Sequence, residues 1–279
     1  MPLDVVGSVR RARLHEVPEI DPLTLELLGT DFVEDVQRFV VPIFRGDDRE
    51  AESIGTGFLL GAGGKYFLVT AAHVLDDLKS GIRHYFFVEP TTTREVSGQA
   101  LIAKLPASGE RDDDTIDVGV VELEGEGLPP YPAVGREALS ASRVAQWQSP
   151  RHGKKYAFLG FPSSKGEVNP MKREIRSASY AYLGTSPAPD DYERMGLSEA
   201  SHILLPFDKK NVITLQASKM NFPKPIGMSG APLWELRRNE DGGRRVVGVM
   251  IESRKLERVF VAADIGFVLK FIRDHFGIK

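Results

Sequence analysis

Residues 66–78 read YFLVTAAHVLDDL, a run of apolar and small side chains that contains a single histidine, His73. A buried leucine or valine needs no hydrogen-bond partner, whereas a buried imidazole does. His73 is therefore either a hydrogen-bonded core residue or a chemically active group. The rest of the sequence decides between these two interpretations of His73.

The sequence around His73 has the pattern of short β-strands. Between residues 38 and 123, apolar or alternating runs rich in β-branched and aromatic side chains are separated by clusters of Gly, Asp and Ser. This density of strands favours a small closed barrel over an open sheet. The strands are expected at 39–45, 53–60, 65–72, 84–90, 96–105 and 117–123.

A second series of strands follows residues 124–142, which are rich in Gly and Pro and are interpreted as a linker. One helix is expected over 21–39, before the first strand, and an amphipathic helix from residue 265 to the end of the sequence. The second series of strands is expected at 154–162, 177–184, 201–207, 211–218, 231–238, 244–253 and 258–265.

Composition limits the classes of function. The 279 residues are 42% hydrophobic and 27% charged, which is enough to bury a substantial core. The net charge of −3 and the pI of about 6.1 do not fit a nucleic-acid binder, and the basic cluster at 10–13 is interpreted as a solvated tail. Cysteine is absent, which excludes disulfides, thiolate zinc sites and a cysteine nucleophile.

No cofactor, metal, nucleic acid or membrane is expected as a partner. Residues 55–65 resemble a phosphate-binding loop but lack a glycine and the Ser or Thr that the motif requires. His84, His152 and His202 have no metal-ligand spacing. Residues 1–21 lack the apolar stretch of a secretory signal, and no window approaches a membrane span, so a soluble cytoplasmic protein is expected.

Two further stretches carry groups that could act with His73. PIGMSGAPLW, at 225–234, sets Ser229 among glycines and prolines, a pattern that alone indicates a tight turn. DDDTIDVGVVEL, at 112–123, sets Asp117 at the start of an apolar strand. The carboxylates at 112–114 compete with Asp117 for a role beside the histidine. They are interpreted as a solvated acidic turn, and Asp117 is preferred because it adjoins the strand.

Together the three stretches resemble the trypsin-like (chymotrypsin-fold) serine peptidases, especially the bacterial, cysteine-free branch with HtrA-type catalytic domains. The T-A-A-H motif lies at 70–73, the motif D-[IV]-x-[VL]-[VL]-x-[LI] at 117–123, and G-x-S-G-x-P at 227–232. The order His, Asp, Ser is that of this fold and differs from the orders in subtilisins and α/β-hydrolases. The resemblance covers about residues 38–265.

This resemblance implies an all-β fold of two six-stranded antiparallel β-barrels, with an N-terminal helical extension and a C-terminal helix. The corresponding division is an extension at 1–37, a first barrel at 38–130 and a second barrel at 131–279. The implied activity is that of a serine endopeptidase that hydrolyses peptide bonds through an acyl-enzyme intermediate. The implied partners are a protein or peptide substrate and, as a further possibility, a regulatory protein.

The family pattern also implies a role for each group. Ser229 is the nucleophile, His73 is the base that takes its proton, and Asp117 holds the imidazole tautomer and stabilises the imidazolium. The backbone N–H groups of Gly227 and Ser229 form the oxyanion hole.

Several residues depart from the pattern of the animal digestive members. Met228 precedes Ser229 where those proteins carry an acid that pairs with a newly cut N-terminus, so that route of activation is not expected. Pro223 occupies the position of the aspartate that selects Lys or Arg. The substrate pocket is assigned to Pro223, Glu252 and Ser253.

Two hypotheses from different classes follow. In the first, the chain is an active serine endopeptidase whose access is restricted by the N-terminal extension or by a separate protein. In the second, the double barrel is a binding module whose triad geometry is disrupted. An intact set of three groups favours the first hypothesis, because a binding module has no physical need for all three.

Overall fold

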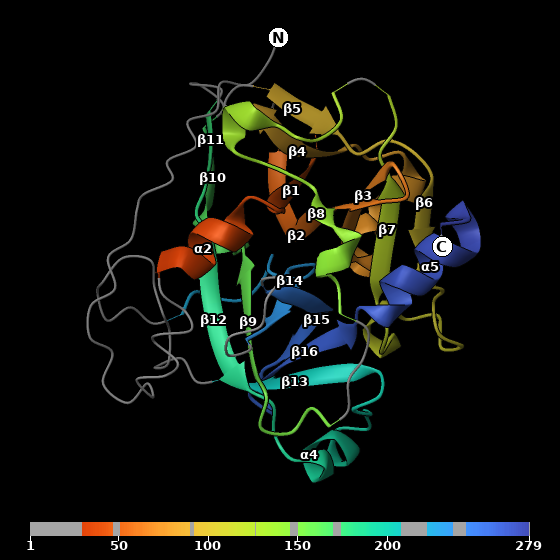
Figure 1. Cartoon of the computed structure of the whole chain (residues 1–279), viewed down its shortest axis with the longest axis vertical. Coiled ribbons are helices and arrows are strands. Elements are labelled where there is room, and N and C mark those ends of the chain that lie inside the picture. The colour runs from red at the N-terminus through yellow and green to blue at the C-terminus, as the bar shows by residue number, and fades with distance from the viewer. Residues whose placement is uncertain are drawn as a thin grey trace.

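The computed structural model describes residues 30–46, 51–89, 92–125, 127–145, 150–169, 174–207, 222–236 and 244–278. Most of the regular structure in these residues is β-strand, arranged in two main sheets that lie one above the other in Figure 1. The all-β fold expected from the sequence is confirmed.

The first sheet has the strand order β5-β4-β1-β2-β3-β7-β6, with β8 beside β2. All pairs in it are antiparallel except the short pairing of β2 with β8. The described residues form eight strands here where six were expected, because β5 lacks apolar alternation and β8 lies in the expected linker. The strands are β1 (Val40–Gly46), β2 (Ala51–Ala62), β3 (Lys65–Ala71), β4 (His84–Glu89), β5 (Thr92–Glu95), β6 (Ala100–Ile102), β7 (Val118–Glu122) and β8 (Leu139–Ser140).

The second sheet has six strands in the described residues, in the order β12-β9-β14-β15-β16-β13. A separate hairpin, β10 with β11, was not expected from the sequence. The strand expected at 211–218 lies outside the described residues. The strands are β9 (Lys155–Gly160), β10 (Gly166–Asn169), β11 (Glu174–Ser177), β12 (Tyr180–Thr185), β13 (His202–Pro206), β14 (Pro232–Glu235), β15 (Arg245–Arg254) and β16 (Val259–Asp264).

Each sheet has its own apolar core, and a larger third core joins the two. In the second sheet the core is aromatic: the ring of Phe260 lies 5.0 Å, centroid to centroid, from those of Phe158 and Tyr182. The joining core includes Phe67 from the first sheet and Trp234 from the second, both fully buried. Because the joining core is continuous, the two sheets hold each other in a fixed relation, and residues carried by both can form one site.

Helices cover the joining core. The part of the expected N-terminal helix that falls in the described residues is α2 (Thr30–Gln37), and the expected terminal helix is α5 (Gly266–Phe276), which lies beside β7 in Figure 1. A short helix, α4 (Pro189–Arg194), was not expected. Within the described ranges, no helix has the length and apolar character needed to cross a bilayer. The remaining helical turns are α3 (Ala72–Leu75), η1 (Asp76–Ser80), η2 (Arg111–Asp113), η3 (Pro132–Val134), η4 (Ala141–Arg143) and η5 (Ser163–Lys165).

The helix α2 is part of the core rather than an appendage. Phe32 and Val36 are fully buried in the joining core, and Asp35 accepts hydrogen bonds from Arg143 at 2.7 and 3.2 Å. We therefore expect Phe32→Ala to lower the free energy of unfolding by about 3–5 kcal/mol in urea denaturation. The exposed Glu34→Ala on the same helix should change it by less than about 0.5 kcal/mol. A loss below about 1 kcal/mol for Phe32→Ala would contradict this account of α2.

Candidate active site

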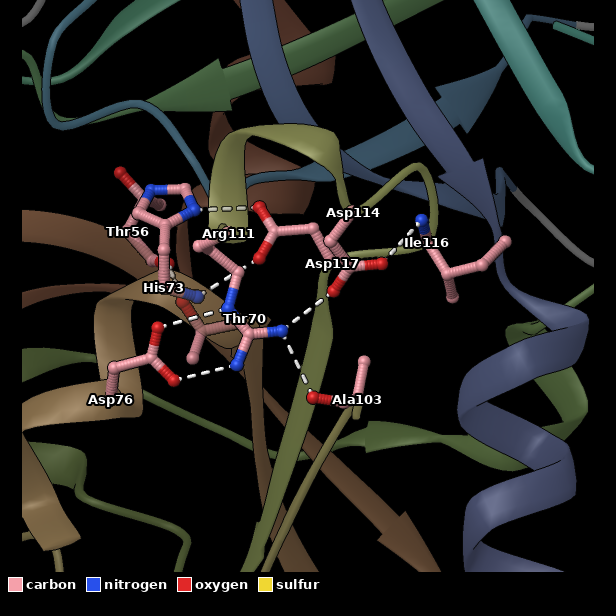
Figure 2. A network of polar contacts seen from close by, with 9 residues as sticks. All are labelled: Thr56, Thr70, His73, Asp76, Ala103, Arg111, Asp114, Ile116 and Asp117. Carbon is pink, nitrogen blue, oxygen red and sulfur yellow. Dashed lines mark hydrogen bonds and ion pairs between the residues drawn. The ribbon is translucent and has the colours of Figure 1, made fainter. Parts of the chain in front are cut away.

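His73 and Asp117 are brought together by the pairing of two neighbouring strands. Ala71 at the end of β3 pairs with Val118 at the start of β7, and the amide of Ala72 then donates to the Asp117 carbonyl oxygen at 2.9 Å. His73 follows in α3, where its ring meets the carboxylate. The Nδ1 of His73 lies 2.6 Å from Oδ2 of Asp117, as Figure 2 shows.

The Asp117 carboxylate is held by both of its oxygens. Besides the contact of Oδ2 with the ring, Oδ1 accepts a hydrogen bond from the backbone N–H of His73 at 2.9 Å. Asp117 is buried, and its backbone has a φ of 37°, in the left-handed region where Asp and Asn are enriched among non-glycine residues. The carboxylate therefore has a fixed direction relative to the imidazole.

The His73 ring is partly open to solvent and electrostatically biased toward its charged form. Partial burial lowers its pKa, but the hydrogen bond and charge of Asp117, together with the charge of Asp76, outweigh burial and raise the pKa above its ordinary value. The side chain is 37% exposed, and among the described residues Nε2 makes no hydrogen bond. Nε2 of His73 is thus available to an external group.

Ser229 lies in a turn anchored to the first sheet. Its carbonyl oxygen accepts a hydrogen bond from the amide of Thr56 in β2 at 2.9 Å, and the amide of Gly230 donates to Met250 at 2.6 Å. Gly230 has a φ of 90°, and a Cβ there would lie 1.9 Å from the Thr56 carbonyl oxygen and 2.1 Å from Oγ1 of Thr70. Only glycine fits so close to β2 and β3, and β3 leads directly to His73.

Thr56 is a residue whose importance the sequence did not indicate. Its Oγ1 donates to the carbonyl oxygen of Gly227 at 2.8 Å and accepts from the amide of Phe161 at 2.9 Å. Its own carbonyl oxygen accepts from Oγ1 of Thr70 at 2.6 Å. Thr56 thus joins the serine-bearing turn to both sheets, and no local motif marks it.

Two backbone N–H groups of the turn have no acceptor among the residues that the structure describes. The amides of Met228 and Gly230 donate to backbone oxygens, whereas those of Gly227 and Ser229 donate no hydrogen bond within the described part of the chain. Gly227 has a φ of 90°, a conformation that L side chains rarely adopt. These are the two amides for which the family resemblance implies an oxyanion hole, and that role stays a prediction. The hydroxyl of Ser229 likewise makes no hydrogen bond with the described residues, His73 included.

The assigned pocket residues lie in different surroundings. Glu252 and Ser253 are half-buried on β15, and Oε1 of Glu252 accepts a hydrogen bond from Nε of Arg254 at 2.7 Å. Arg254 in turn donates to the Met195 carbonyl oxygen. Pro223 is half-buried near the start of the serine-bearing segment. Because Glu252 is paired with Arg254, its negative charge is compensated.

The acidic run at 112–114 differs from the expected solvated turn. The side chain of Asp114 is only 8% exposed, and it accepts hydrogen bonds from Arg111 at 2.6 Å and from the amide of Ile116 at 3.0 Å. The interpretation as a solvated turn is therefore wrong for Asp114. Arg111, three positions before Asp114, is the signal that could have indicated its burial, since a buried carboxylate needs a cation or a hydrogen-bond donor nearby.

Two histidines that lack metal-ligand spacing contact backbone carbonyl oxygens. The ring nitrogens of the fully buried His84 lie 3.0 Å from the Ile82 oxygen and 2.9 Å from the Val74 oxygen. His202 contacts the Thr115 oxygen at 2.7 Å across the two sheets. Both rings are thereby structural contacts beside the segments that carry His73 and Asp117.

Comparisons with known proteins show the fold. No family model and no curated protein matches the sequence. Among solved structures, the chain is similar to neuropsin, described as a serine protease expressed in the limbic system of mouse brain, with 15% identity and a TM-score of 0.57 over 86% of this chain and 95% of that one. It is also similar to human heparin binding protein, with 14% identity and a TM-score of 0.53 over 86% of this chain and 92% of that one. The resemblance to the HtrA-type branch stays a prediction. The chain has the double-barrel fold of the trypsin-like serine proteases.

Proposed function

We propose that the protein is a serine endopeptidase that acts on protein or peptide substrates. The observation that carries the proposal is the contact of Nδ1 of His73 with the buried carboxylate of Asp117 at 2.6 Å. This contact leaves the other ring nitrogen available as a base. The anchoring of the Ser229 turn to β2 through Thr56 supports the same function, as do the amides of Gly227 and Ser229, which have no acceptor within the described ranges.

In this mechanism the Ser229 hydroxyl attacks the carbonyl carbon of the scissile bond while Nε2 of His73 takes its proton. Asp117 keeps the remaining proton on Nδ1 and stabilises the imidazolium. The amides of Gly227 and Ser229 donate to the oxygen on which negative charge develops. His73 then protonates the leaving amine. In the second half of the reaction, Nε2 of His73 takes a proton from the water molecule that attacks the acyl carbon and gives it to the Ser229 oxygen as the carboxylic acid product is released.

The second candidate is a catalytically silent or partner-gated domain that binds proteins. One observation favours it: among the described residues, the Ser229 hydroxyl makes no hydrogen bond, so the nucleophile and the base are not coupled in this state. A partner or substrate that brings the Ser229 hydroxyl into hydrogen-bond contact with Nε2 of His73 would convert the silent state into the active one. Catalytic hydrogen bonds often form fully only in the complex.

A fluorophosphonate probe tests the proposal. Native protein should gain one probe per chain, and peptide mass spectrometry should locate it on Ser229. The urea-unfolded chain should remain unlabelled, because an isolated serine hydroxyl is a weak nucleophile. Cleavage of a peptide library should accompany labelling. Native protein that neither labels nor cleaves, alone or with candidate activating peptides, would favour the silent binding module.

The pH dependence of labelling reports on His73. Only the neutral imidazole can accept the serine proton, and the raised pKa keeps the ring protonated to a higher pH than usual. The labelling rate should therefore rise with pH, with a midpoint above about 6.5, the ordinary histidine value. A stopped-flow pH series from 5 to about 9 measures the midpoint. A midpoint clearly below 6.5 would contradict the assigned contacts of His73.

A further inference from the structure

We propose that Arg111 is a positioning residue that ties the segment carrying His73 to the segment carrying Asp117 and balances the charge beside them. The inference rests on the proposed function of this site. Arg111 lies in η2, and its guanidinium is placed between two carboxylates in Figure 2. The side chain of Arg111 is only 13% exposed and that of Asp114 8%, whereas Asp76 is 34% exposed.

One end of the guanidinium holds the histidine segment. Nε and Nη2 of Arg111 donate to the two oxygens of Asp76 at 2.9 and 2.7 Å. Asp76 directly follows α3, the single turn that contains His73. A bidentate Arg–carboxylate contact restricts both direction and distance. The end of α3 is thereby fixed relative to η2.

The other end holds the aspartate segment. Nη1 of Arg111 donates to Asp114 at 2.6 Å and to the Ala103 carbonyl oxygen at 2.9 Å. The second oxygen of Asp114 accepts from the amide of Ile116 at 3.0 Å. Ile116 directly precedes Asp117, whose backbone is in the left-handed region. The contacts therefore run from the end of α3 through one guanidinium to the residue before Asp117.

The geometry requires arginine. The planar guanidinium donates four hydrogen bonds to three acceptor groups, and lysine, with a compact ammonium group, cannot span them. Removal of Arg111 would leave the carboxylates of Asp76 and Asp114 without their shared cation. Since Asp114 is 8% exposed, its carboxylate would be a nearly buried and uncompensated charge.

The same contacts set the charge that faces His73. Burial and Arg111 lower the pKa of His73, whereas Asp117 and Asp76 raise it. Asp77, the next residue of η1, pairs with Arg45. Arg111 therefore lowers the pKa of His73 and Asp76 raises it. A residue with a purely structural role would not produce these two opposite effects on the pKa.

Two variants test these opposite effects on the pKa of His73. Arg111→Gln should shift the midpoint of the His73 titration to higher pH, because Asp76 and Asp114 then act without the cation. Asp76→Asn should shift it to lower pH, because the cation acts with one carboxylate fewer. Each shift should be about 0.5 pH unit or more. Arg111→Lys keeps the positive charge but loses the bidentate hydrogen bonds of the guanidinium. It should slow fluorophosphonate labelling about 10-fold and shift the His73 midpoint less than Arg111→Gln does.

The readouts are the NMR titration of the His73 ring, assigned by its loss in His73→Ala, and the pH profile of fluorophosphonate labelling. The control is Arg194→Gln, which removes an exposed Arg–Asp contact on α4 and should shift neither readout.

Shifts of opposite sign in Arg111→Gln and Asp76→Asn support the proposal, and no shift or shifts of the same sign overturn it. If Arg111→Gln does not fold, Arg111→Lys decides, because an unchanged labelling rate in that variant would overturn the positioning role of Arg111. The NMR titration needs no activity, so failure of the proposed function is separable from failure of this inference.

Discussion

Asp117→Asn is expected to lower kcat/KM for peptide hydrolysis by about 10⁴-fold and to change the free energy of unfolding by less than about 1 kcal/mol. The backbone of Asp117 has a φ of 37°, and asparagine tolerates the left-handed region as aspartate does. The substitution should therefore remove the charge without moving the chain. Alanine would be a poorer choice, because it disfavours this conformation.

The large effect follows from how the two oxygens of Asp117 are used. Oδ1 accepts from the backbone N–H of His73 and Oδ2 faces Nδ1 of the ring. In the asparagine variant the amide oxygen must stay on the backbone N–H, so the NH₂ group faces Nδ1. Nδ1 must then be an acceptor, which places the ring proton on Nε2. In that tautomer His73 cannot take the proton of Ser229.

The measurement compares kcat/KM and probe labelling of Asp117→Asn with those of Asp113→Asn, an exposed aspartate in the same loop. The control should keep the wild-type rate within about twofold, and urea denaturation should show both variants folded. A loss of less than about 10-fold in Asp117→Asn would mean that the carboxylate does not control the tautomer of His73. The assignment of these residues as a catalytic pair would then be wrong.

Much of the fold could be predicted because its signals are local. The alternating apolar runs mark most strands of both sheets, and the amphipathic pattern at the end of the sequence marks α5. The contact of His73 with Asp117 was also predictable, but only through the resemblance of their two motifs to the trypsin-like pattern. The hairpin β10–β11 was not, because its residues carry no periodic apolar signal.

The contacts that hold the site together could not be predicted in the same way. Thr56 and Gly227 are joined by a hydrogen bond although 171 positions separate them, and Arg111 meets Asp76 over 35 positions. Threonine in a strand and aspartate after a helical turn are common, so neither residue stands out without its partner. Motifs indicate the candidate reactive groups, whereas long-range polar contacts decide how those groups are held.

Ser229→Ala is expected to cause the largest loss, on the order of 10⁶-fold in kcat, and to abolish fluorophosphonate labelling. The backbone contact that anchors the turn, from the amide of Thr56 to the carbonyl oxygen of residue 229, does not involve the side chain. Within the described residues the hydroxyl has no hydrogen-bond partner to lose, so the free energy of unfolding should change by less than about 0.5 kcal/mol. Ser229→Ala should thus lose its activity and keep its stability.

Combining the variants shows whether the residues act as one unit. If Ser229 attacks and Asp117 acts only through His73, then Ser229→Ala with Asp117→Asn should lose no more activity than Ser229→Ala alone. The exposed Ser80→Ala is the matched control and should keep the wild-type rate. Hydrolysis by Ser229→Ala within about 100-fold of the wild-type rate, falling further when Asp117 is also changed, would show that the main reaction uses His73 and Asp117 without Ser229. That result would contradict the acyl-enzyme mechanism, because its nucleophile could then be removed without stopping the chemistry.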